Sequence, residues 1–483
     1  MEAGLPADTP RLARTTPAPR IGIVHLGPGA FFRAFNAIWT EEAMAAQGGD
    51  WGICAVSLKS PTARDQMAPQ DGCFTAVELG PAGETRKVIG AVAEVLVAPE
   101  DPALVVSRMA DPGVRIVSLT VTEKGYCHEP STGHLRLDHP DIAHDLSNPD
   151  RPRSALGFIV AALRARRAAG TGPFTVLSCD NLPSNGAVVR GVVLEFARAL
   201  DATLADWIAG TVTFPATMVD RITPATTEAD LQRLAQAEGY RDPAMVVHEP
   251  FRQWVIEDDF TAGRPAWDAV GAQMVSTVEA HELMKLRCLN GTHSTLAYLG
   301  YLGGYETIAD TVADPAYAAL CERLWADEIV PTLPQPEGED LQAYTAALMA
   351  RYRNPAIRHR TWQIAMDGSQ KLPQRLLGTI RDNLAAGRVP HGLCLAVAAW
   401  MRYVGGVDEQ GGAIDVRDPL AADLKAASDS AQTAEAKVAA LLAKHEVFDA
   451  GLAEDARFRE AVIAAYTALL NNGARAAVAA RTA

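Results

Sequence analysis

The hydrophobic pattern of this 483-residue chain changes near residue 280, and no other feature limits the fold as strongly. Before that point, short β-branched runs alternate with amphipathic stretches, whereas after it the apolar residues recur at helical spacing. Strand, helix and strand in succession predict a parallel sheet with right-handed crossovers. We therefore expect an α/β domain over residues 21–280 and a mostly α-helical domain over residues 281–483, after a proline-rich loose leader at residues 1–20.

Four apolar runs in the first part predict buried strands, at residues 21–27, 51–58, 114–121 and 174–181. A helix is predicted between the last two runs, at residues 154–170. Ser154 is suited to cap its start, and Gly170 to end it.

Composition excludes several classes of protein. Acidic residues outnumber basic ones by 58 to 44, and no basic block is present, so a nucleic-acid partner is not expected. The longest apolar run, residues 392–401, has about half the length of a membrane span, and we identify no signal peptide. The seven cysteines lack C-x-x-C spacing, which is typical of reduced thiols in a cytoplasmic protein.

A glycine-containing turn follows the first predicted strand, at residues 27–33. Gly27 and Gly29 would let backbone N–H groups approach a pyrophosphate, as in a Rossmann-type dinucleotide-binding domain. The third glycine of the usual motif is replaced by Phe32, so an ordinary strand-to-helix turn is the alternative. The residues expected at the coenzyme are Gly27, Gly29, Phe31, Phe32 and Arg33.

A second motif opens the helical part and contains Lys285, Asn290 and His293. In a helix this spacing places the three side chains on one side, so that all three can face one cleft of the protein. A lysine, an amide and an imidazole together suit proton transfer and the polarisation of a carbonyl group. The structural alternative is a solvated lysine, an Asn-Gly helix end and a core histidine.

Several segments occur in the order found in the polyol-specific long-chain dehydrogenases, the mannitol dehydrogenase family. They are GPGAFFRAF, SLTVTEKGY, SCDNLPSNG, FPATMVDRI, EPFRQWVIEDDF, MKLRCLNGTHSTLAYLG and MDGSQKLPQR. The resemblance covers nearly the whole chain. It implies an NAD(P)-dependent oxidoreductase that interconverts a ketose-type sugar and its alcohol.

The resemblance also implies roles for individual residues. Lys285 matches the family's general acid/base, and Asn181 and Asn290 match an amide pair that holds the substrate oxygen. His293 matches a residue that orients the substrate, and Glu123 a carboxylate that relays the lysine's proton. Asp220 and Lys371 match residues that face the substrate. A substrate contact is also expected at Arg360, from the cationic stretch described below and not from the resemblance.

Two departures from the family pattern concern the coenzyme. Phe32 and Phe35 replace two histidines, and Leu58-Lys59 stands where NAD-preferring mannitol dehydrogenases tend to have acids. We predict NAD(H) as coenzyme. NADP(H) remains the alternative, since Lys59 or Arg64 would attract a 2′-phosphate.

No metal is expected, because the histidines lack ligand spacing. The Y-x-x-x-K pair of short-chain dehydrogenases is absent, as are the G-x-S-x-G and P-loop motifs. A nucleotide-sensing protein without activity is disfavoured by the presence of Lys285 and both amides.

The substrate is expected to be a small sugar acid or polyol. Segments such as TVTEKGYC and HRTWQIAMDGSQKLPQR resemble the fructuronate reductases more than the mannitol dehydrogenases. Arg358, Arg360, Lys371 and Arg375 form a cationic stretch suited to a carboxylate. We predict reduction of D-fructuronate to D-mannonate, with mannitol 2-dehydrogenase or another polyol dehydrogenase as the alternative, and a monomer, as is common in the family.

Overall fold

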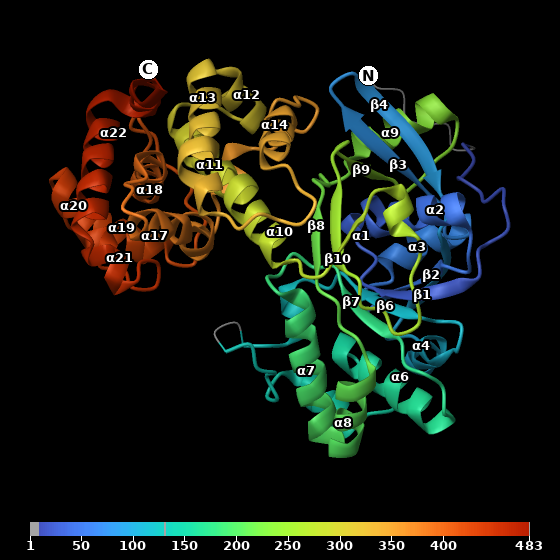
Figure 1. Cartoon of the computed structure of the whole chain (residues 1–483). Helices are drawn as coiled ribbons and strands as arrows, with labels where there is room; N and C mark the ends of the chain where they lie inside the picture. The colour runs from blue at the N-terminus through green and yellow to red at the C-terminus, as the bar shows by residue number, and fades with distance from the viewer. Residues whose placement is uncertain (1–8, 130–131, 483) are drawn as a thin grey trace. The chain divides into compact units, whose positions relative to one another are not determined.

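The computed structural model describes residues 9–129 and 132–482. Its internal contacts divide the chain into two units, the first ending at Glu279 and the second beginning at Ala280 (Figure 1). The first unit contains the strands, and the second is built from helices. This is the predicted fold class, an α/β Rossmann-type domain followed by a mostly helical one, and it is confirmed.

The central sheet of the first unit has five parallel strands in the order β5-β2-β1-β6-β7. The strands are β1 (Ile21–Leu26), β2 (Gly52–Ser57), β5 (Val92–Val97), β6 (Ile116–Leu119) and β7 (Thr175–Ser178). The four predicted runs are β1, β2, β6 and β7. Because all five strands are parallel, their carboxyl ends meet at one edge, where ligands bind in sheets of this kind.

Both faces of this sheet are covered. Ile23, Ile53 and Ile116 point into a core shared with α1 (Ala30–Ala34) and α2 (Asn36–Gln47). The neighbouring residues Val24 and Val117 point into the opposite core. That core is completed by α4 (Pro102–Ala110), α6 (Ala155–Ala169), α7 (Asn185–Leu200) and α8 (Ala202–Thr211), which lie together on one side of the strands in Figure 1.

Two smaller sheets, which the sequence analysis does not predict, complete the first unit. One has the order β4-β3-β9, with β3 (Phe74–Gly80), β4 (Gly83–Ile89) and β9 (Val246–His248). The other has the order β11-β10-β8, with β8 (Thr217–Asp220), β10 (Gln253–Glu257) and β11 (Gln273–Val275). The remaining α-helices described in this unit are α3 (Thr62–Met67), α5 (Pro140–Ser147) and α9 (Glu228–Glu238).

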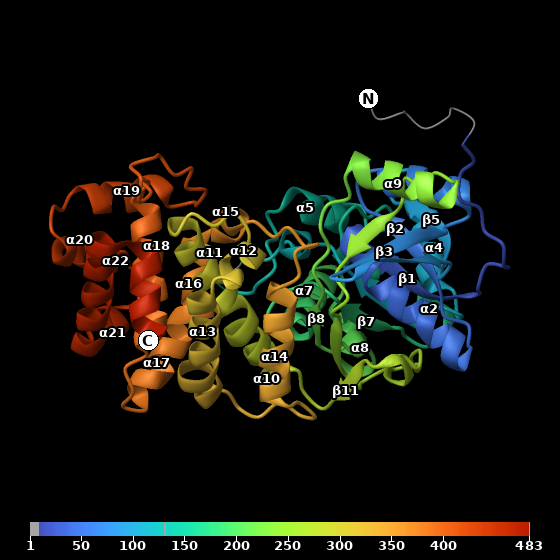
Figure 2. The same ribbon diagram turned by 90° about the horizontal axis from the view of Figure 1, so that it is seen from above.

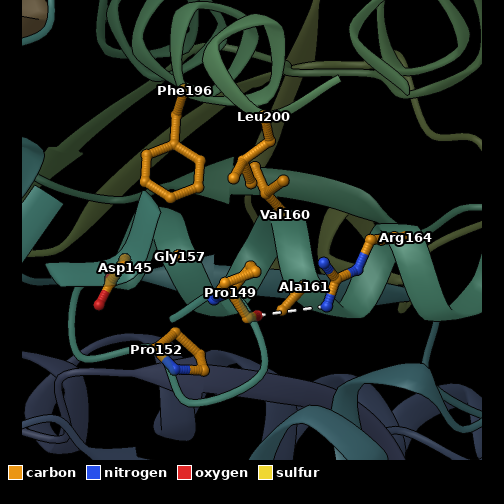
Figure 3. Close-up of a pocket in the computed structure, with 9 residues that line it drawn as sticks. All are labelled: Asp145, Pro149, Pro152, Gly157, Val160, Ala161, Arg164, Phe196 and Leu200. Carbon is orange, nitrogen blue, oxygen red and sulfur yellow. Dashed lines mark hydrogen bonds between the residues drawn. The ribbon is translucent and has the colours of Figure 1, made fainter. Parts of the chain in front are cut away.

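Helix α6 begins and ends as predicted. The Ser154 hydroxyl accepts a hydrogen bond from the Gly157 N–H (2.9 Å), and Gly170 closes the helix in the left-handed region at φ 67°. Figure 3 shows Asp145 beside Gly157, near the side chains of Phe196 and Leu200. A Cβ at Gly157 would lie 2.2 Å from the Asp145 carboxylate, so this close approach requires glycine.

The expectation of a loose leader is wrong for the part of it that the structure describes next to β1. Leu12 is buried, and its N–H donates to the carbonyl oxygen of Arg241 (3.0 Å). The Arg14 guanidinium donates to the carbonyl oxygens of Gly90 (3.0 Å) and Val92 (2.6 Å). These bonds fix a segment that the proline content suggested would be free, while residues 1–8 lie outside the described residues.

The second unit is helical, as predicted. Its helices are α10 (Glu279–Met284), α11 (Thr292–Leu302), α12 (Ile308–Ala313), α13 (Pro315–Arg323), α14 (Leu341–Tyr352), α15 (Thr361–Ala365), α16 (Gly368–Leu372), α17 (Gly378–Ala385), α18 (His391–Val404), α19 (Ala421–Asp429), α20 (Ala434–Leu442), α21 (Ala450–Glu454) and α22 (Ala456–Thr482). The apolar helix α18 is buried over most of its length and packs against α11 and α22 (Figure 2). None of the described helices is long and apolar enough to cross a membrane.

Three segments of this unit are wound as π-helix. They are η4 (Lys285–Gly291), η5 (Leu324–Ile329) and η7 (Pro373–Leu377), and η4 packs against both of the others. Short π-helical insertions are rare and occur mainly at functional sites. The predicted catalytic motif begins in η4.

Candidate active site

The turn after β1 is shaped for a close backbone approach. Gly27 has φ 94°, and a Cβ there would lie 2.2 Å from the carbonyl oxygen of Thr120. Gly29 caps the start of α1, and a Cβ there would meet nothing closer than 4.0 Å. The space beside the Cα atom of Gly29 is therefore open, which suits the close approach of a pyrophosphate to this turn.

Two of the side chains expected at the coenzyme point away from this opening. Phe32 is fully buried and stacks on His25, with 3.9 Å between ring centres. Arg33 is also buried, donates to the carbonyl oxygen of Pro28 (3.3 Å), and has its pKa lowered to about 10 by burial. Both side chains support the turn from inside, so a contact of Phe32 or Arg33 with the coenzyme would come from the backbone N–H group, and these two assignments stay predictions. Phe31 is partly exposed and stacks on Phe35.

Glu123 and Asn181 lie just beyond the carboxyl ends of the adjacent strands β6 and β7. Both residues are exposed. The neighbouring Asp180 is buried, and its carboxylate accepts hydrogen bonds from the N–H of Thr122 (2.8 Å) and the hydroxyl of Tyr126 (2.7 Å). Burial raises the pKa of Asp180, against the effect of these bonds.

Thr122 adopts an unusual backbone conformation directly before Glu123. Its φ of 63° and ψ of 164° fall in a region that is almost confined to glycine. The bond to Asp180 and the bond from the Gly125 N–H to the Thr122 carbonyl oxygen (2.9 Å) hold this conformation. These hydrogen bonds fix the strained turn that presents Glu123. The sequence alone does not indicate this backbone conformation.

Lys285 is the first residue of η4 and is buried. A π-helical turn leaves carbonyl groups without their usual helical partners. In η4 the Cys288 carbonyl oxygen accepts from Trp325 Nε1 (2.9 Å), and the Leu289 carbonyl oxygen accepts from the Tyr352 hydroxyl (2.9 Å). These aromatic side chains stabilise the register that places Lys285, while Asn290, at the end of the same turn, is half-buried.

Gly291 brings η4 against η7. A Cβ at this position would lie 2.9 Å from the carbonyl oxygen of Arg375. The Arg375 guanidinium, which is mostly buried, donates to the Ser294 hydroxyl of α11 (3.1 Å). The Asn-Gly pair is therefore not a helix end, because the chain continues from η4 directly into α11.

His293 is buried in the first turn of α11. Its ring stacks on Tyr352 at 5.5 Å and meets His359 edge-on at 4.6 Å. Burial lowers its pKa well below the ordinary value, and the basic groups His359, Arg375, Arg351 and Lys371 lower it further. His293 is therefore neutral near pH 7 and is suited to donating or accepting one hydrogen bond with a hydroxyl group.

The predicted cationic stretch is divided by the fold. Lys371 lies in α16, where its ammonium donates to the carbonyl oxygens of Met366 (2.5 Å) and Ile364 (3.4 Å), and burial lowers its pKa. Arg358 and Arg360 are exposed, and both lie close to Glu306, at 3.5 and 3.7 Å. Arg360, which the sequence analysis places at the substrate, is thus held at the surface by a carboxylate and is not among the groups that act on His293.

Asp220 is buried at the end of β8. Arg221, which follows it, donates to the carbonyl oxygens of Ala34 in α1 (2.8 Å) and Glu249 (3.1 Å). Burial lowers the pKa of Arg221 to about 10. Arg221 therefore joins β8 to the helix that follows the glycine turn.

The sequence analysis does not identify several residues that lie around His293 or beside Glu123 and Asn181. Arg351 and His359 come from α14 and the loop that follows it, and neither belongs to a motif that spacing could reveal. Tyr126 and Asp180 belong to the segments SLTVTEKGY and SCDNLPSNG, but the family resemblance implies no role for either residue. Within the part of the chain that the structure describes, no group of histidines, cysteines or acids is arranged to bind a metal ion.

Comparison with known proteins places both units in one family. The model of the mannitol dehydrogenase Rossmann domain matches residues 21–269, and that of the mannitol dehydrogenase C-terminal domain matches residues 277–470. The D-mannonate oxidoreductase of Escherichia coli K12 is 52% identical over 462 residues, which are 95% of each chain.

Solved structures agree with this assignment. The mannitol 2-dehydrogenase of Pseudomonas fluorescens, in a ternary complex with NAD and D-mannitol, is 40% identical and superposes with a TM-score of 0.81 over 98% of this chain and 96% of its own. A substrate-free D-sorbitol dehydrogenase is 35% identical and gives a TM-score of 0.90 over 95% of each chain. The predicted family is confirmed: this chain belongs to the mannitol dehydrogenase family, whose members are NAD-dependent oxidoreductases that act on CH–OH groups.

Proposed function

We propose that this chain interconverts a keto sugar acid and its alcohol with NAD(H), with D-fructuronate and D-mannonate as its substrate pair. The observation that supports this substrate most strongly is the cluster of basic groups around His293. His359 contacts the ring of His293 at 4.6 Å, and Arg375 donates to the hydroxyl of Ser294, the next residue (3.1 Å). Arg351 and Lys371 also lower the pKa of His293.

Of these four groups His359 is neutral near pH 7, whereas Arg351 is buried and Lys371 and Arg375 are partly buried. Cations in such surroundings repel one another and have lost part of their hydration. Of the two acids that act on Lys371, Asp418 already accepts hydrogen bonds from the N–H and the hydroxyl of Ser369. A substrate carboxylate would offset the positive charge of Arg375, whose guanidinium is a planar group suited to binding it through two oxygens. A neutral polyol would not offset this charge.

The comparisons support the same substrate. The relative that is 52% identical is named for D-mannonate, whereas the solved relative bound to D-mannitol is 40% identical. The second candidate, a polyol dehydrogenase, is compatible with Lys285, Asn290 and His293, since these residues would serve either substrate equally.

In the proposed reaction Lys285 takes the proton of the substrate hydroxyl as the adjacent C–H bond breaks, and returns it during reduction of the ketone. The turn containing Gly27 and Gly29 would hold NAD⁺, which would supply the acceptor for the hydride of that carbon. Asn181 and Asn290 donate amide N–H groups to the substrate oxygen and so stabilise its developing negative charge. His293 orients the substrate, Asp220 binds it, and Glu123 passes the lysine's proton to water.

This mechanism assigns a separate task to each part of the chain. Residues 21–280 would bind the coenzyme and contribute Glu123, Asn181 and Asp220. Residues 281–483 would contribute Lys285, Asn290, His293 and the basic groups that select the substrate.

Comparing kcat/KM for D-mannonate and D-mannitol, measured through NADH absorbance at 340 nm, tests the substrate. We expect the value for D-mannonate to be at least about tenfold higher, which corresponds to about 1.4 kcal/mol of selective transition-state stabilisation. A higher value for D-mannitol would overturn the proposed substrate.

Two arginine variants make the test specific. Arg375→Gln should raise KM for D-mannonate strongly, while Arg360→Gln, which removes the same charge at the surface beside Glu306, should leave it within about twofold, as expected for an exposed ion pair. Equal effects of the two variants would argue against a buried carboxylate site.

A further inference from the structure

A cavity of about 660 Å³ lies beyond the carboxyl ends of β2 and β5, wholly within the first unit. Its wall includes Lys59, which follows β2, together with Arg151, Pro152 and Arg153 from the segment that precedes α6. The mechanism proposed above uses none of these residues.

The basic side chains of this wall lack acidic partners. Lys59, Arg151 and Arg153 are exposed, and within residues 9–129 and 132–482 none of the three forms an ion pair with a carboxylate. Asp141 is the one acid among the residues that line the cavity. Three positive charges therefore face a space that contains a single negative one.

Arg64, which the sequence analysis named beside Lys59, does not join them. Its guanidinium binds both carboxylate oxygens of Glu100 (2.8 and 3.0 Å) and also Asp65 (2.6 Å). The charge of Arg64 is therefore neutralised by acids. Lys59, Arg151 and Arg153 differ from Arg64 in lacking such ion pairs, although all four residues lie near the same edge of the sheet.

The segment that presents Arg151 and Arg153 is fixed. The buried Asp145 carboxylate accepts hydrogen bonds from the N–H groups of Arg153 (2.8 Å) and Ser154 (2.9 Å). Arg164 donates to the Pro149 carbonyl oxygen (3.3 Å), the bond drawn in Figure 3. Two arginines on a fixed segment can bind an anion with little loss of conformational entropy.

The position of the cavity points to its ligand. In dinucleotide-binding folds, an acid at the end of the second strand binds the adenosine ribose 2′-hydroxyl, and a basic residue nearby accommodates a 2′-phosphate instead. Here Leu58 and Lys59 occupy that point, with no acid. We propose that Lys59, Arg151 and Arg153 bind the 2′-phosphate of a phosphorylated dinucleotide, so that this chain takes NADP(H) as well as NAD(H).

This inference rests on the coenzyme site proposed above, and the test separates the two. The full chain is titrated with NADH and with NADPH, and binding is followed through coenzyme fluorescence. We expect the two dissociation constants to agree within about tenfold, because no acid repels the phosphate. Tight NADH binding together with no NADPH binding at millimolar concentration would overturn the inference and leave the proposed function intact, whereas loss of both would count against the coenzyme site itself.

Variants identify the residues. Lys59→Glu should weaken NADPH binding at least about tenfold, since it replaces an attraction by a repulsion, and should change NADH binding by less than about twofold. The double variant Arg151→Ala/Arg153→Ala should act in the same direction. Lys425→Ala removes the same charge from α19, where Lys425 pairs with Asp429, and should change neither constant. Unchanged NADPH binding in both Lys59→Glu and the double variant would overturn the inference.

A competition experiment separates a nucleotide site from a surface that binds any phosphate. We expect 2′-AMP to displace NADPH at lower concentration than 5′-AMP, and inorganic phosphate to displace it weakly. If inorganic phosphate competed as well as 2′-AMP, the cations would form a general anion site, and the inference would be wrong.

Discussion

At the scale of single residues, the chain keeps several histidines uncharged by burying them. His25 is fully buried between Ser118 and Thr120, with 2.8 Å from each ring nitrogen to a hydroxyl oxygen, and burial lowers its pKa to about 3. His248 is buried and His359 is partly buried, and loss of contact with water lowers the pKa of each to about 4. Each of these groups makes the folded chain sensitive to acid.

The effect of pH on stability has a definite sign. An unfolded histidine titrates near pH 6.5, so between about pH 6.5 and pH 3 the unfolded chain binds a proton at this position that folded His25 does not. The stabilisation that comes from keeping these histidines neutral should therefore be fully present above about pH 6.5. Below that pH the free energy of unfolding should fall, by up to about 1.4 kcal/mol per pH unit for each such histidine.

Urea unfolding at pH 7.0, 6.0 and 5.0 tests this prediction. His25→Gln removes the titrating group and should reduce the dependence of the unfolding free energy on pH, although it also lowers stability at pH 7. His445→Gln, at an exposed position, should keep the dependence of the parent chain. Identical pH dependence in the parent chain and His25→Gln would contradict the assignment.

At the scale of elements, the catalytic motif depends on a helical register that sequence patterns do not encode. The spacing of Lys285, Asn290 and His293 predicts a helix, and the chain is helical there, but as η4 followed by α11. A π-helical turn differs from an α-helical one in its hydrogen bonds, whereas the hydrophobic pattern reports only which side chains are buried. The angles expected from an α-helix therefore do not apply between Lys285 and Gly291.

Gly291 provides a test of this packing. Gly291→Ala would place a Cβ 2.9 Å from the Arg375 carbonyl oxygen and so displace η7, at a cost of about 1–3 kcal/mol. Because Arg375 lies in η7, we expect KM for D-mannonate to rise about tenfold. Gly378→Ala is the matched control, since its Cβ would meet nothing closer than 3.8 Å. If the two variants had the same kinetics and stability, close packing of η4 against η7 would not matter for the site.

The hydrophobic pattern predicts some strands of the first unit and not others, and their burial and length explain the difference. β1, β2, β6 and β7 are buried on both faces and therefore appear as continuous apolar runs. β4 is missed because its sequence, GETRKVI, is polar and almost wholly exposed. The strands β9 and β11 have only three residues each, too few for a period to be recognised.

At the scale of the whole molecule, a formal net charge of −14 contrasts with the positive charges of the two candidate sites. The long-range field of the chain repels anionic substrates, while the basic groups around His293 attract them at short range. At an ionic strength of about 0.15 M the screening length is only about 8 Å, so the local cations determine how salt acts on binding.

Raising NaCl from about 0.05 to about 0.5 M should therefore raise KM for D-mannonate roughly threefold, through screening of the local attraction. KM for D-mannitol, an uncharged polyol, should stay constant and serves as the control for general effects of salt. A parallel change for both substrates would show that the basic cluster does not bind a carboxylate.

The candidate site is only partly predictable from the sequence, because some of its residues form a local motif and others come from distant segments. Lys285, Asn290 and His293 lie within nine residues and form a motif, so pattern and resemblance both find them. The charges around His293 come from segments up to 82 residues away, and burial of a charged side chain cannot be read from composition. Arg360 and Arg375 are equivalent in the sequence, and only the fold distinguishes the exposed Arg360 from the partly buried Arg375.

The account depends most directly on Lys285 as the group that exchanges a proton with the substrate. The decisive measurement is the pH profile of kcat/KM for D-mannonate oxidation in Lys285→Ala, with Asn290→Ala as its control. We expect Lys285→Ala to lower kcat by about 10²–10⁴, to abolish the ionisation that controls the profile, and to leave NADH binding intact. Asn290→Ala should slow turnover without changing the profile, since an amide does not titrate. A Lys285→Ala enzyme with near-normal kcat and the profile of the parent chain would contradict the account.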